Sequence, residues 1–369
     1  MKILVTGAKG FVGKNLIAEL KNQEYKDILE YDLDTDPSLL DDYCREAEFI
    51  FHLAGVNRPK EQSEFMTGNF RFTSDLLDTL KKHRNTCPIM LSSSTQALLD
   101  NPYGKSKKAG EELLFAYSEE TGVKVLIYRF PNVFGKWCRP NYNSAVATFC
   151  NNVANDLPIT VNDPSVVMNL VYIDDVVEEL IQALKGREDR KGKYCAVRTV
   201  YTITLGEIVD LIYSFKASRK ERSIPDMSDE FIKKLYATYL SYLPQDQFGY
   251  PLKMNVDSRG SFTEFIRTKD RGQVSVNVSR PGITKGNHWH HTKNEKFLVV
   301  SGQGVIRFRK IDSNEVIEYH VNGDKLEVLD IPTGYTHNIS NTGETDMVTV
   351  MWANEPFDPG KPDTYYLEV

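Results

Sequence analysis

The chain opens on K-I-L-V-T-G-A-K-G-F-V-G, residues 2–13, a short apolar run followed at once by a glycine-rich turn. The apolar run predicts a buried β-strand, and the amphipathic stretch over residues 13–21 predicts a helix. Gly7, Gly10 and Gly13 permit a tight turn and a close backbone approach, so a pyrophosphate can rest on the helix N-terminus. Because a strand precedes the turn and a helix follows it, the pattern indicates nucleotide binding rather than a purely structural turn.

The same alternation of apolar runs and amphipathic stretches continues to about residue 243. Apolar runs fall at 3–5, 28–31, 49–53, 89–91 and 125–128, with amphipathic stretches at 73–83 and 103–121. Such alternation predicts a doubly wound parallel sheet covered by helices on both faces, over residues 1–243. Helix signals nearly vanish after the stretch 244–256, which we interpret as a linker. Short strands separated by Gly, Asn and Asp then predict a second, all-β barrel domain over 257–369.

Composition excludes several classes of function. A formal net charge of −6 without a basic face argues against nucleic acid or an anionic membrane as partner. No apolar run approaches the ~18 residues that a membrane span needs. Five scattered cysteines fit neither a disulfide framework nor a zinc ribbon and indicate a reducing compartment. The first strand begins directly after Met1 and leaves no room for a signal peptide, so we expect a cytoplasmic protein.

Further residues complete the expected dinucleotide site. Asp32 closes the second predicted strand, where a carboxylate hydrogen-bonds the adenosine ribose. Tyr103 and Lys107 are four residues apart at the start of a predicted helix and therefore share one face. An ammonium beside a phenol lowers the phenol pKa, so Tyr103 could exchange a proton with a carbonyl or alcohol near neutral pH. Ser94 ends the preceding strand, where its hydroxyl could hold the same oxygen.

The C-terminal third contains the residue types of a metal site. The stretch G-I-T-K-G-N-H-W-H-H-T-K-N-E, residues 282–295, places His288 and His290 on the same side of a strand. Glu295 arrives after a turn, and His337 follows a Pro-x-Gly turn. Three imidazoles and one carboxylate suit Zn, Fe, Mn, Ni or Cu, with zinc the default. We therefore expect one divalent metal, and the sequence leaves open which of the four residues bind it directly.

Residues 1–243 resemble the extended short-chain dehydrogenases/reductases of the nucleotide-sugar type. The shared pieces are the G-x-x-G-x-x-G turn, H-L-A-G at 52–55, Asn69, Ser94, Y-G-K-S-K at 103–107, R-F-P-N-V-F-G at 129–135 and Y-I-D-D at 172–175. The resemblance implies that Ser94, Tyr103 and Lys107 are catalytic. It implies cofactor contacts from Gly7, Lys9, Gly10, Phe11, Val12, Gly13, Asp32, Leu53, Ala54, Gly55, Tyr103 and Lys107. It also implies substrate contacts from Asn69, Arg129 and Asn132.

One departure from this family narrows the reaction. Nucleotide-sugar dehydratases follow the catalytic Thr with an Asp-Glu pair, whereas Ser94 is followed by Thr-Gln-Ala. Dehydration is therefore not expected, which leaves reduction, oxidation or 4-epimerisation. Asp32, with two further Asp residues nearby, would repel a 2′-phosphate and favours NADH, whereas Lys9 could attract one. Reductases of this type commonly use NADPH, so the resemblance favours NADPH over NADH.

Residues 257–369 resemble the cupins. The pattern G-x5-H-x-H-x4-E-x6-G over 282–302 matches the first cupin motif, and P-x-G-x2-H-x3-N over 332–341 matches most of the second. Leu326 stands where the second motif has Gly. D-x-R-G-x-F-x-E over 257–264, with K-G-N-H over 285–288, is similar to the sugar-nucleotide 3,5-epimerases, which are also cupins.

An extended reductase followed by a cupin resembles the bacterial capsular-polysaccharide enzymes of the CapF type. The resemblance implies that the cupin epimerises a UDP-4-keto-6-deoxy-N-acetylhexosamine at C3. The reductase would then convert the C4 ketone with NADPH to UDP-2-acetamido-2,6-dideoxy-L-talose, on the route to N-acetyl-L-fucosamine. Two alternatives stay open, namely a 4-epimerase with a structural cupin and a non-catalytic nucleotide-sensing or dimerisation module. A homodimer is expected because cupins often pair through their sheets.

Overall fold

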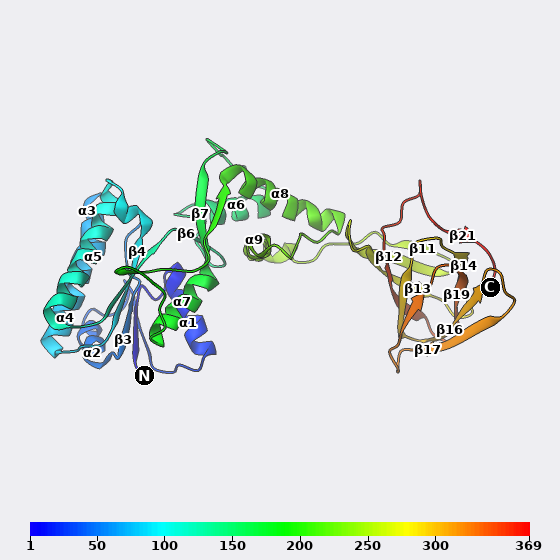
Figure 1. Ribbon diagram of the computed structural model, residues 1–369, viewed down its shortest axis with the longest axis horizontal. Helices are drawn as coiled ribbons and strands as arrows, with labels where there is room; N and C mark the ends of the chain where they lie inside the picture. The colour runs from blue at the N-terminus through cyan, green and yellow to red at the C-terminus, as the bar shows by residue number, and fades with distance from the viewer. The chain divides into compact units, whose positions relative to one another are not determined.

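The computed structural model describes all 369 residues and divides the chain into two compact units (Figure 1). The first unit comprises Met1–Tyr213 and Ser228–Pro244, and the second comprises Ser214–Met227 and Gln245–Val369. Ser214–Met227 therefore belongs with the β-rich part of the chain, although the sequence predicted it in the first domain. One reason is Arg222, whose guanidinium pairs with Glu264 at 2.9 Å and whose carbonyl accepts the Arg267 N–H at 2.8 Å.

The first unit is built on a seven-stranded sheet in the order β2-β1-β3-β4-β5-β9-β8. Its strands are β1 (Ile3–Thr6), β2 (Ile28–Tyr31), β3 (Phe49–His52), β4 (Ile89–Ser94), β5 (Val125–Phe130), β8 (Arg190–Lys191) and β9 (Tyr194–Cys195). Every neighbouring pair is parallel except the β8–β9 hairpin. Because β1 lies between β2 and β3, the chain winds away from β1 in both directions. Such a switch point leaves a crevice for a nucleotide beyond the carboxyl ends of the strands.

Helices cover both faces of this sheet, with α2, α4 and α5 on one side and α1 and α7 on the other (Figure 1). The helices are α1 (Phe11–Asn22), α2 (Leu39–Glu46), α3 (Ser63–Met66), η1 (Thr67–Arg71), α4 (Phe72–His83), η2 (Thr95–Leu98), α5 (Pro102–Thr121), α6 (Ala145–Ala154), α7 (Ile173–Leu184), α8 (Leu205–Glu221) and α9 (Glu230–Leu240). All residues of β1 and β3 are buried, as a sheet covered on both faces requires. None of the helices combines the length and apolar character that crossing a bilayer requires.

A second, three-stranded sheet in the order β10-β7-β6 extends the first unit. Its strands are β6 (Asn132–Phe134), β7 (Val167–Tyr172) and β10 (Tyr201–Thr204). β6 follows β5 after a single residue, so the loop that leaves the carboxyl end of the main sheet leads directly into it. All five cysteines of the chain are free and buried, in agreement with the expectation that they form no disulfide framework.

The second unit contains the C-terminal part of α8 and two antiparallel sheets, in the orders β11-β12-β13-β20-β15-β18 and β17-β16-β19-β14-β21. Its elements are η3 (Gln245–Gln247), β11 (Asn255–Asp257), β12 (Gly260–Arg267), β13 (Gln273–Ser279), β14 (Thr284–Trp289), β15 (Glu295–Ser301), β16 (Gln303–Lys310), β17 (Val316–Asn322), β18 (Val328–Ile331), β19 (Tyr335–Asn341), β20 (Met347–Ala353) and β21 (Tyr365–Tyr366). Phe297, Ile306 and Ile339, from both sheets, share one buried apolar core. The expected barrel is thus a pair of sheets that enclose a core and share no strand.

Strand β13 reverses the usual alternation of a half-buried strand. Its polar residues Gln273, Ser275, Asn277 and Ser279 are buried, whereas the three valines between them are partly exposed. The space between the sheets is therefore apolar in one part and lined with hydroxyl and amide groups in another. Val276 and Val278 of β13 pair with Val350 and Val348 of β20, which are also partly exposed. The outer face of this sheet is therefore apolar at these positions.

Candidate functional sites

The glycine turn after β1 leaves no space for side chains. Gly7 has a φ of +68°, and a Cβ at this position would lie 2.7 Å from the Ala54 nitrogen. A Cβ at Gly13 would lie 2.2 Å from the Gly7 carbonyl oxygen. The helix α1 begins with Phe11 and Val12, and no side chain caps its N-terminus. Its first amides can therefore bind a phosphate, as the sequence predicts.

Asp32 lies beside this turn and is held by the backbone. Its carboxylate accepts the Lys9 N–H at 2.7 Å and the Leu33 N–H at 2.8 Å. The ammonium of Lys9 forms an ion pair with Asp34, which raises the pKa of Lys9. Lys9, the expected partner of a 2′-phosphate, is therefore already paired with Asp34, and the negative charge of Asp32 remains beside it.

The start of α5 places the predicted catalytic tyrosine beside the end of β4. Asn101 accepts the Gly104 N–H at 2.7 Å and Pro102 occupies the first turn, a combination that favours helix initiation at this point. Tyr103 then lies within reach of Ser94, whose hydroxyl hydrogen-bonds its side chain. The Phe65 ring packs 5.7 Å from the Tyr103 ring. Burial raises the pKa of Tyr103, and the Ser94 hydrogen bond opposes this rise only in part.

Lys107 occupies the same face of α5, buried one turn further along. Its Nζ donates to the Ser92 carbonyl at 3.1 Å and lies 5.9 Å from the centroid of the Tyr103 ring. Burial lowers the pKa of Lys107 to about 8, and the carboxylate of Glu111 opposes this fall. The sequence predicted that Lys107 would lower the Tyr103 pKa. The structure differs because burial dominates at both groups and the ammonium is bonded to a carbonyl instead.

The side chain of Asn69 is hydrogen-bonded to neighbouring residues of the first unit. Its Nδ2 donates to the Val56 carbonyl at 3.0 Å and to the Ser106 hydroxyl at 2.9 Å, and its Oδ1 accepts the Val56 N–H at 2.8 Å. A Cβ at Gly55 would lie 2.8 Å from Asn69 Oδ1 and 2.9 Å from Lys107 Nζ. Asn69 and Gly55 thus fix the loop after β3 against α5, and the substrate contact of Asn69 stays a prediction.

Arg129, a predicted substrate contact, is bonded to other side chains of the first unit. Its guanidinium forms a bidentate pair with the buried Glu111, at 2.9 and 2.5 Å, and donates to the Tyr194 hydroxyl at 2.7 Å. The Ser93 hydroxyl donates to the same carboxylate at 2.5 Å. A substrate contact from Arg129 would require this network to open.

The remaining predicted residues lie around the crevice. The Leu53 N–H donates to the Thr6 carbonyl at 3.2 Å and the Ala54 N–H donates to the Thr6 hydroxyl at 3.3 Å, which joins the ends of β1 and β3. His52 is buried between Thr6 and Thr73, and burial lowers its pKa to about 3, so its imidazole is neutral. Asn132 is exposed at the start of β6, and its substrate contact stays a prediction.

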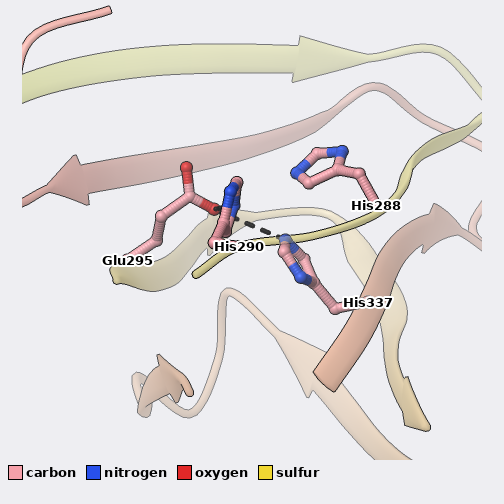
Figure 2. Close-up of side chains that lie close together, drawn as sticks. All are labelled: His288, His290, Glu295 and His337. Carbon is pink, nitrogen blue, oxygen red and sulfur yellow. Dashed lines mark ion pairs between the residues drawn. The ribbon is translucent and has the colours of Figure 1, made fainter. Parts of the chain in front are cut away.

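The second unit brings the four predicted metal ligands together (Figure 2). One potential donor atom from each of His288, His290, Glu295 and His337 lies within 4.8 Å of the others. His290 and His337 place their Nε2 atoms 3.6 and 3.4 Å from a Glu295 carboxylate oxygen. His288 and His337 face each other across the β14–β19 pair, with ring centroids 4.6 Å apart.

Several of these donor atoms have no hydrogen-bond partner although they are buried. They are Nε2 of His290, both ring nitrogens of His337 and Oε2 of Glu295. Buried polar atoms are normally bonded, so unpartnered donor atoms that converge on one point fit a cation. Burial lowers the pKa of His288 to about 4, which leaves a neutral imidazole with a free lone pair. Burial would raise the pKa of Glu295, but His290 and His337 outweigh it and hold the value at about 2, so the carboxylate is ionised.

Two residues that sequence reasoning missed support these sites. Glu111 joins β4, β5 and α5 through buried hydrogen bonds, and Asp363 accepts a hydrogen bond from the His290 ring through its backbone carbonyl. The helical spacing from Lys107 to Glu111 was a usable signal for the first residue. Nothing in the sequence signals the second, because its carbonyl makes the contact from 73 positions away.

The fold and residues of the first unit define an NAD(P)-dependent enzyme of the short-chain type, followed here by an all-β unit. Residues 3–197 match the NAD dependent epimerase/dehydratase family, and residues 255–365 match the polysaccharide biosynthesis C-terminal domain. The crystal structure of the capsular polysaccharide assembling protein CapF from Staphylococcus aureus superposes with a TM-score of 0.96, at 58% identity over 100% of both chains. The chain therefore belongs to the NAD dependent epimerase/dehydratase family and, within it, to the CapF type.

Two further comparisons extend this result. A UDP-2-acetamido-2,6-beta-L-arabino-hexul-4-ose reductase from Pseudomonas aeruginosa is 44% identical over 100% of this chain and 99% of its own. A UDP-glucuronic acid 4-epimerase from Bacillus cereus, solved with NAD, superposes with a TM-score of 0.56 at 20% identity. It covers 66% of this chain and 98% of its own, and at this identity it supports the fold of the first unit alone.

Proposed function

We propose that this protein epimerises a UDP-4-keto-6-deoxy-N-acetylhexosamine at C3 and reduces its C4 ketone to UDP-2-acetamido-2,6-dideoxy-L-talose for capsular polysaccharide synthesis. The observation that carries the proposal is the presence of two separate chemical sites on one chain. Ser94, Tyr103 and Lys107 gather in the first unit, and three imidazoles with one carboxylate gather in the second. The Pseudomonas aeruginosa relative is named as a reductase of a UDP-linked 4-ketosugar, which supports the substrate class.

In the reductase site the residues of the chain handle the proton. NADPH supplies the hydride to C4 when it is bound. Tyr103 donates its phenolic proton to the C4 oxygen as negative charge develops there, and the Ser94 hydroxyl holds the same oxygen. The Lys107 ammonium, which is bonded to the Ser92 carbonyl and lies 5.9 Å from the centroid of the Tyr103 ring, would supply positive charge near the phenolate left behind. The raised pKa of Tyr103 suits the direction of reduction, because it keeps the phenol protonated until the oxygen of the substrate demands the proton.

In the second site, four residues would hold one divalent metal, with zinc as the default. A metal held there would supply Lewis-acid chemistry to a ketone, which would make the neighbouring C3 proton acidic enough to exchange with solvent. The same unit also holds buried polar groups. Lys285 donates to Asn277 Oδ1 and to the Val278 carbonyl, both at 2.8 Å, and Ser275 and Thr349 are buried on paired strands. We include these groups in the proposal as candidate partners of the sugar hydroxyls.

NADPH is the proposed cofactor, with NADH as the alternative. Reductases of this type commonly use NADPH, which supports the first choice. The Lys9–Asp34 ion pair and the negative charge of Asp32 favour NADH instead. A homodimer through the cupin-like unit is part of the same proposal. The partly exposed valines of β13 and β20 form an apolar outer sheet face that a second copy could cover.

The test is proton NMR of the full chain in D2O with the UDP-4-ketosugar, before and after NADPH is added. We expect deuterium at C3 without NADPH, and reduction at C4 once NADPH is present. Tyr103→Phe should abolish reduction and keep C3 exchange, and His290→Ala should do the reverse. Reduction without any exchange would reduce the second unit to a structural part.

A 4-epimerase with a structural cupin predicts a different outcome. It would retain NAD tightly and consume no reduced cofactor over many turnovers. A nucleotide-sensing or dimerisation module predicts neither exchange nor reduction. The assembled Ser94, Tyr103 and Lys107 argue against this last alternative, because a sensor needs no proton donor.

A further inference from the structure

The C-terminal tail of the chain lies directly against β14, the strand that carries His288 and ends one residue before His290. Tyr365 and Tyr366 form β21, which pairs with β14 so that Tyr366 stands opposite His288. The Leu367 N–H donates to the Asn287 carbonyl at 3.0 Å. The Lys293 ammonium, which is buried, donates to the Pro362 carbonyl at 2.5 Å. We call residues 362–367 the tail strap.

One residue of the tail strap touches the ring of His290. The His290 Nδ1 lies 2.6 Å from the Asp363 carbonyl oxygen. A carbonyl can only accept, so Nδ1 must carry the hydrogen and donate it. In a neutral imidazole that hydrogen is the only one, so Nε2, which lies 3.6 Å from the Glu295 carboxylate, would then hold a lone pair. This is the tautomer that a metal requires at that position.

The side chain of the same residue fixes the turn that follows His290. The Asp363 carboxylate accepts the N–H groups of His291, Thr292 and Lys293 at 3.0, 2.8 and 2.8 Å, and the Thr292 hydroxyl at 3.1 Å. These are three of the four residues that join His290 to the strand that begins with Glu295. The side chain of Asp363 thus holds the segment between His290 and Glu295, and its backbone carbonyl orients the His290 ring.

We propose that Asp363 is the positioning residue of the metal site, and that the tail strap presets His290 for metal before any metal arrives. The inference rests on the metal-binding part of the proposed function. Asp363 has a φ of +40°, a conformation that most residues avoid and Asp tolerates. With that backbone geometry its carboxylate and its carbonyl both reach the 290–293 segment. An uncharged or shorter side chain would release the turn and let the His290 ring rotate.

The experiment measures Zn²⁺ affinity of the metal-free full chain by competition with a chromophoric chelator. Asp363→Asn keeps the size of the side chain but replaces one acceptor oxygen by an NH2 group that meets backbone donors. We expect its Zn²⁺ affinity to fall about 10–100-fold, the usual effect of removing a partner that orients a metal-binding histidine. The matched control is Asp358→Asn, since Asp358 bonds only within its own turn, to the Gly360 N–H at 2.8 Å. The control should retain wild-type affinity.

A second measurement does not depend on how the variants fold. The ¹⁵N shifts of the histidine rings in the metal-free wild-type chain report the tautomer of His290, which we expect to carry its hydrogen on Nδ1. Hydrogen on Nε2, or equal Zn²⁺ affinity of Asp363→Asn and wild type, would overturn the inference. A wild-type chain that binds no Zn²⁺ at all would instead overturn the metal part of the proposed function, so the two failures are distinguishable.

Discussion

Replacing the buried carboxylate of Glu111 by an amide should destabilise the first unit. Glu111 is only 1% exposed and accepts from Ser93, from two nitrogens of Arg129 and from Tyr194. In Glu111→Gln the new NH2 group faces an N–H of Arg129, so one arm of the bidentate pair becomes donor against donor. The guanidinium, 18% exposed, then loses its counter-charge with little access to water.

The size of the effect follows from this geometry. Breaking a buried ion pair by removing one partner costs about 3–5 kcal/mol, and the partial exposure of Arg129 places the expected loss near the lower end, about 3 kcal/mol. For a unit of this size a loss of about 3 kcal/mol lowers the Tm by roughly 6–12 °C. Calorimetry of the full chain measures it, and the transition of the first unit is the one that NADPH raises.

The control is the neighbouring residue of the same helix. Glu112 is exposed, so Glu112→Gln should change stability by no more than about 0.5 kcal/mol. The double replacement Glu111→Leu with Arg129→Met should recover much of the loss, because it leaves no unpaired charge. If Glu111→Gln unfolds at the temperature of the control, the network adds nothing to stability and the argument from burial fails.

Three further predictions concern the cofactor and the proton. Gly13→Ala places a Cβ 2.2 Å from the Gly7 carbonyl oxygen, a strain of about 1–3 kcal/mol. We expect NADPH binding to weaken roughly tenfold or more, which fluorescence titration would measure. Asp34→Asn frees the Lys9 ammonium and should increase the affinity for NADPH by at most about fivefold, while the affinity for NADH is unchanged. Equal effects on both cofactors would contradict a contact between Lys9 and the 2′-phosphate. Finally, kcat/KM for reduction should fall as pH rises through about 8, because Lys107 loses its proton there; a rate–pH profile that stays flat to pH 10 would exclude a role for the ammonium.

Local patterns in the sequence predicted the parts of the structure that depend on neighbours along the chain. The glycine turn, the start of α5 and the gathering of His288, His290, Glu295 and His337 follow from spacing and motif. Membership of the CapF type is confirmed, as is an α/β unit followed by β-sheets. The predicted catalytic and metal-binding roles themselves stay predictions.

The sequence could not predict partners that are far away along the chain. Arg129 belongs to the motif of a substrate pocket, and in the structure it contacts Glu111 and Tyr194, which no local pattern places beside it. The predicted effect of Lys107 on Tyr103 assumed exposed charges, whereas burial governs both pKa values in the structure. The barrel was inferred from the short strands and from the resemblance to the cupin motifs, and neither determines whether two sheets share a strand.

The proposed chemistry also fixes the order of the two reactions. The C3 proton is acidic only while C4 is a ketone, because the carbonyl accepts the charge left by the departing proton. Reduction at C4 removes that acceptor, so the second unit must act before the first, and hydride transfer makes the new C3 configuration permanent. Exchange at C3 in the absence of NADPH should therefore be reversible and continuous, whereas added NADPH should stop it as the ketone is consumed. The Tyr103→Phe variant, unable to protonate C4, should keep exchanging even when NADPH is present, and that contrast separates two coupled sites from two independent ones.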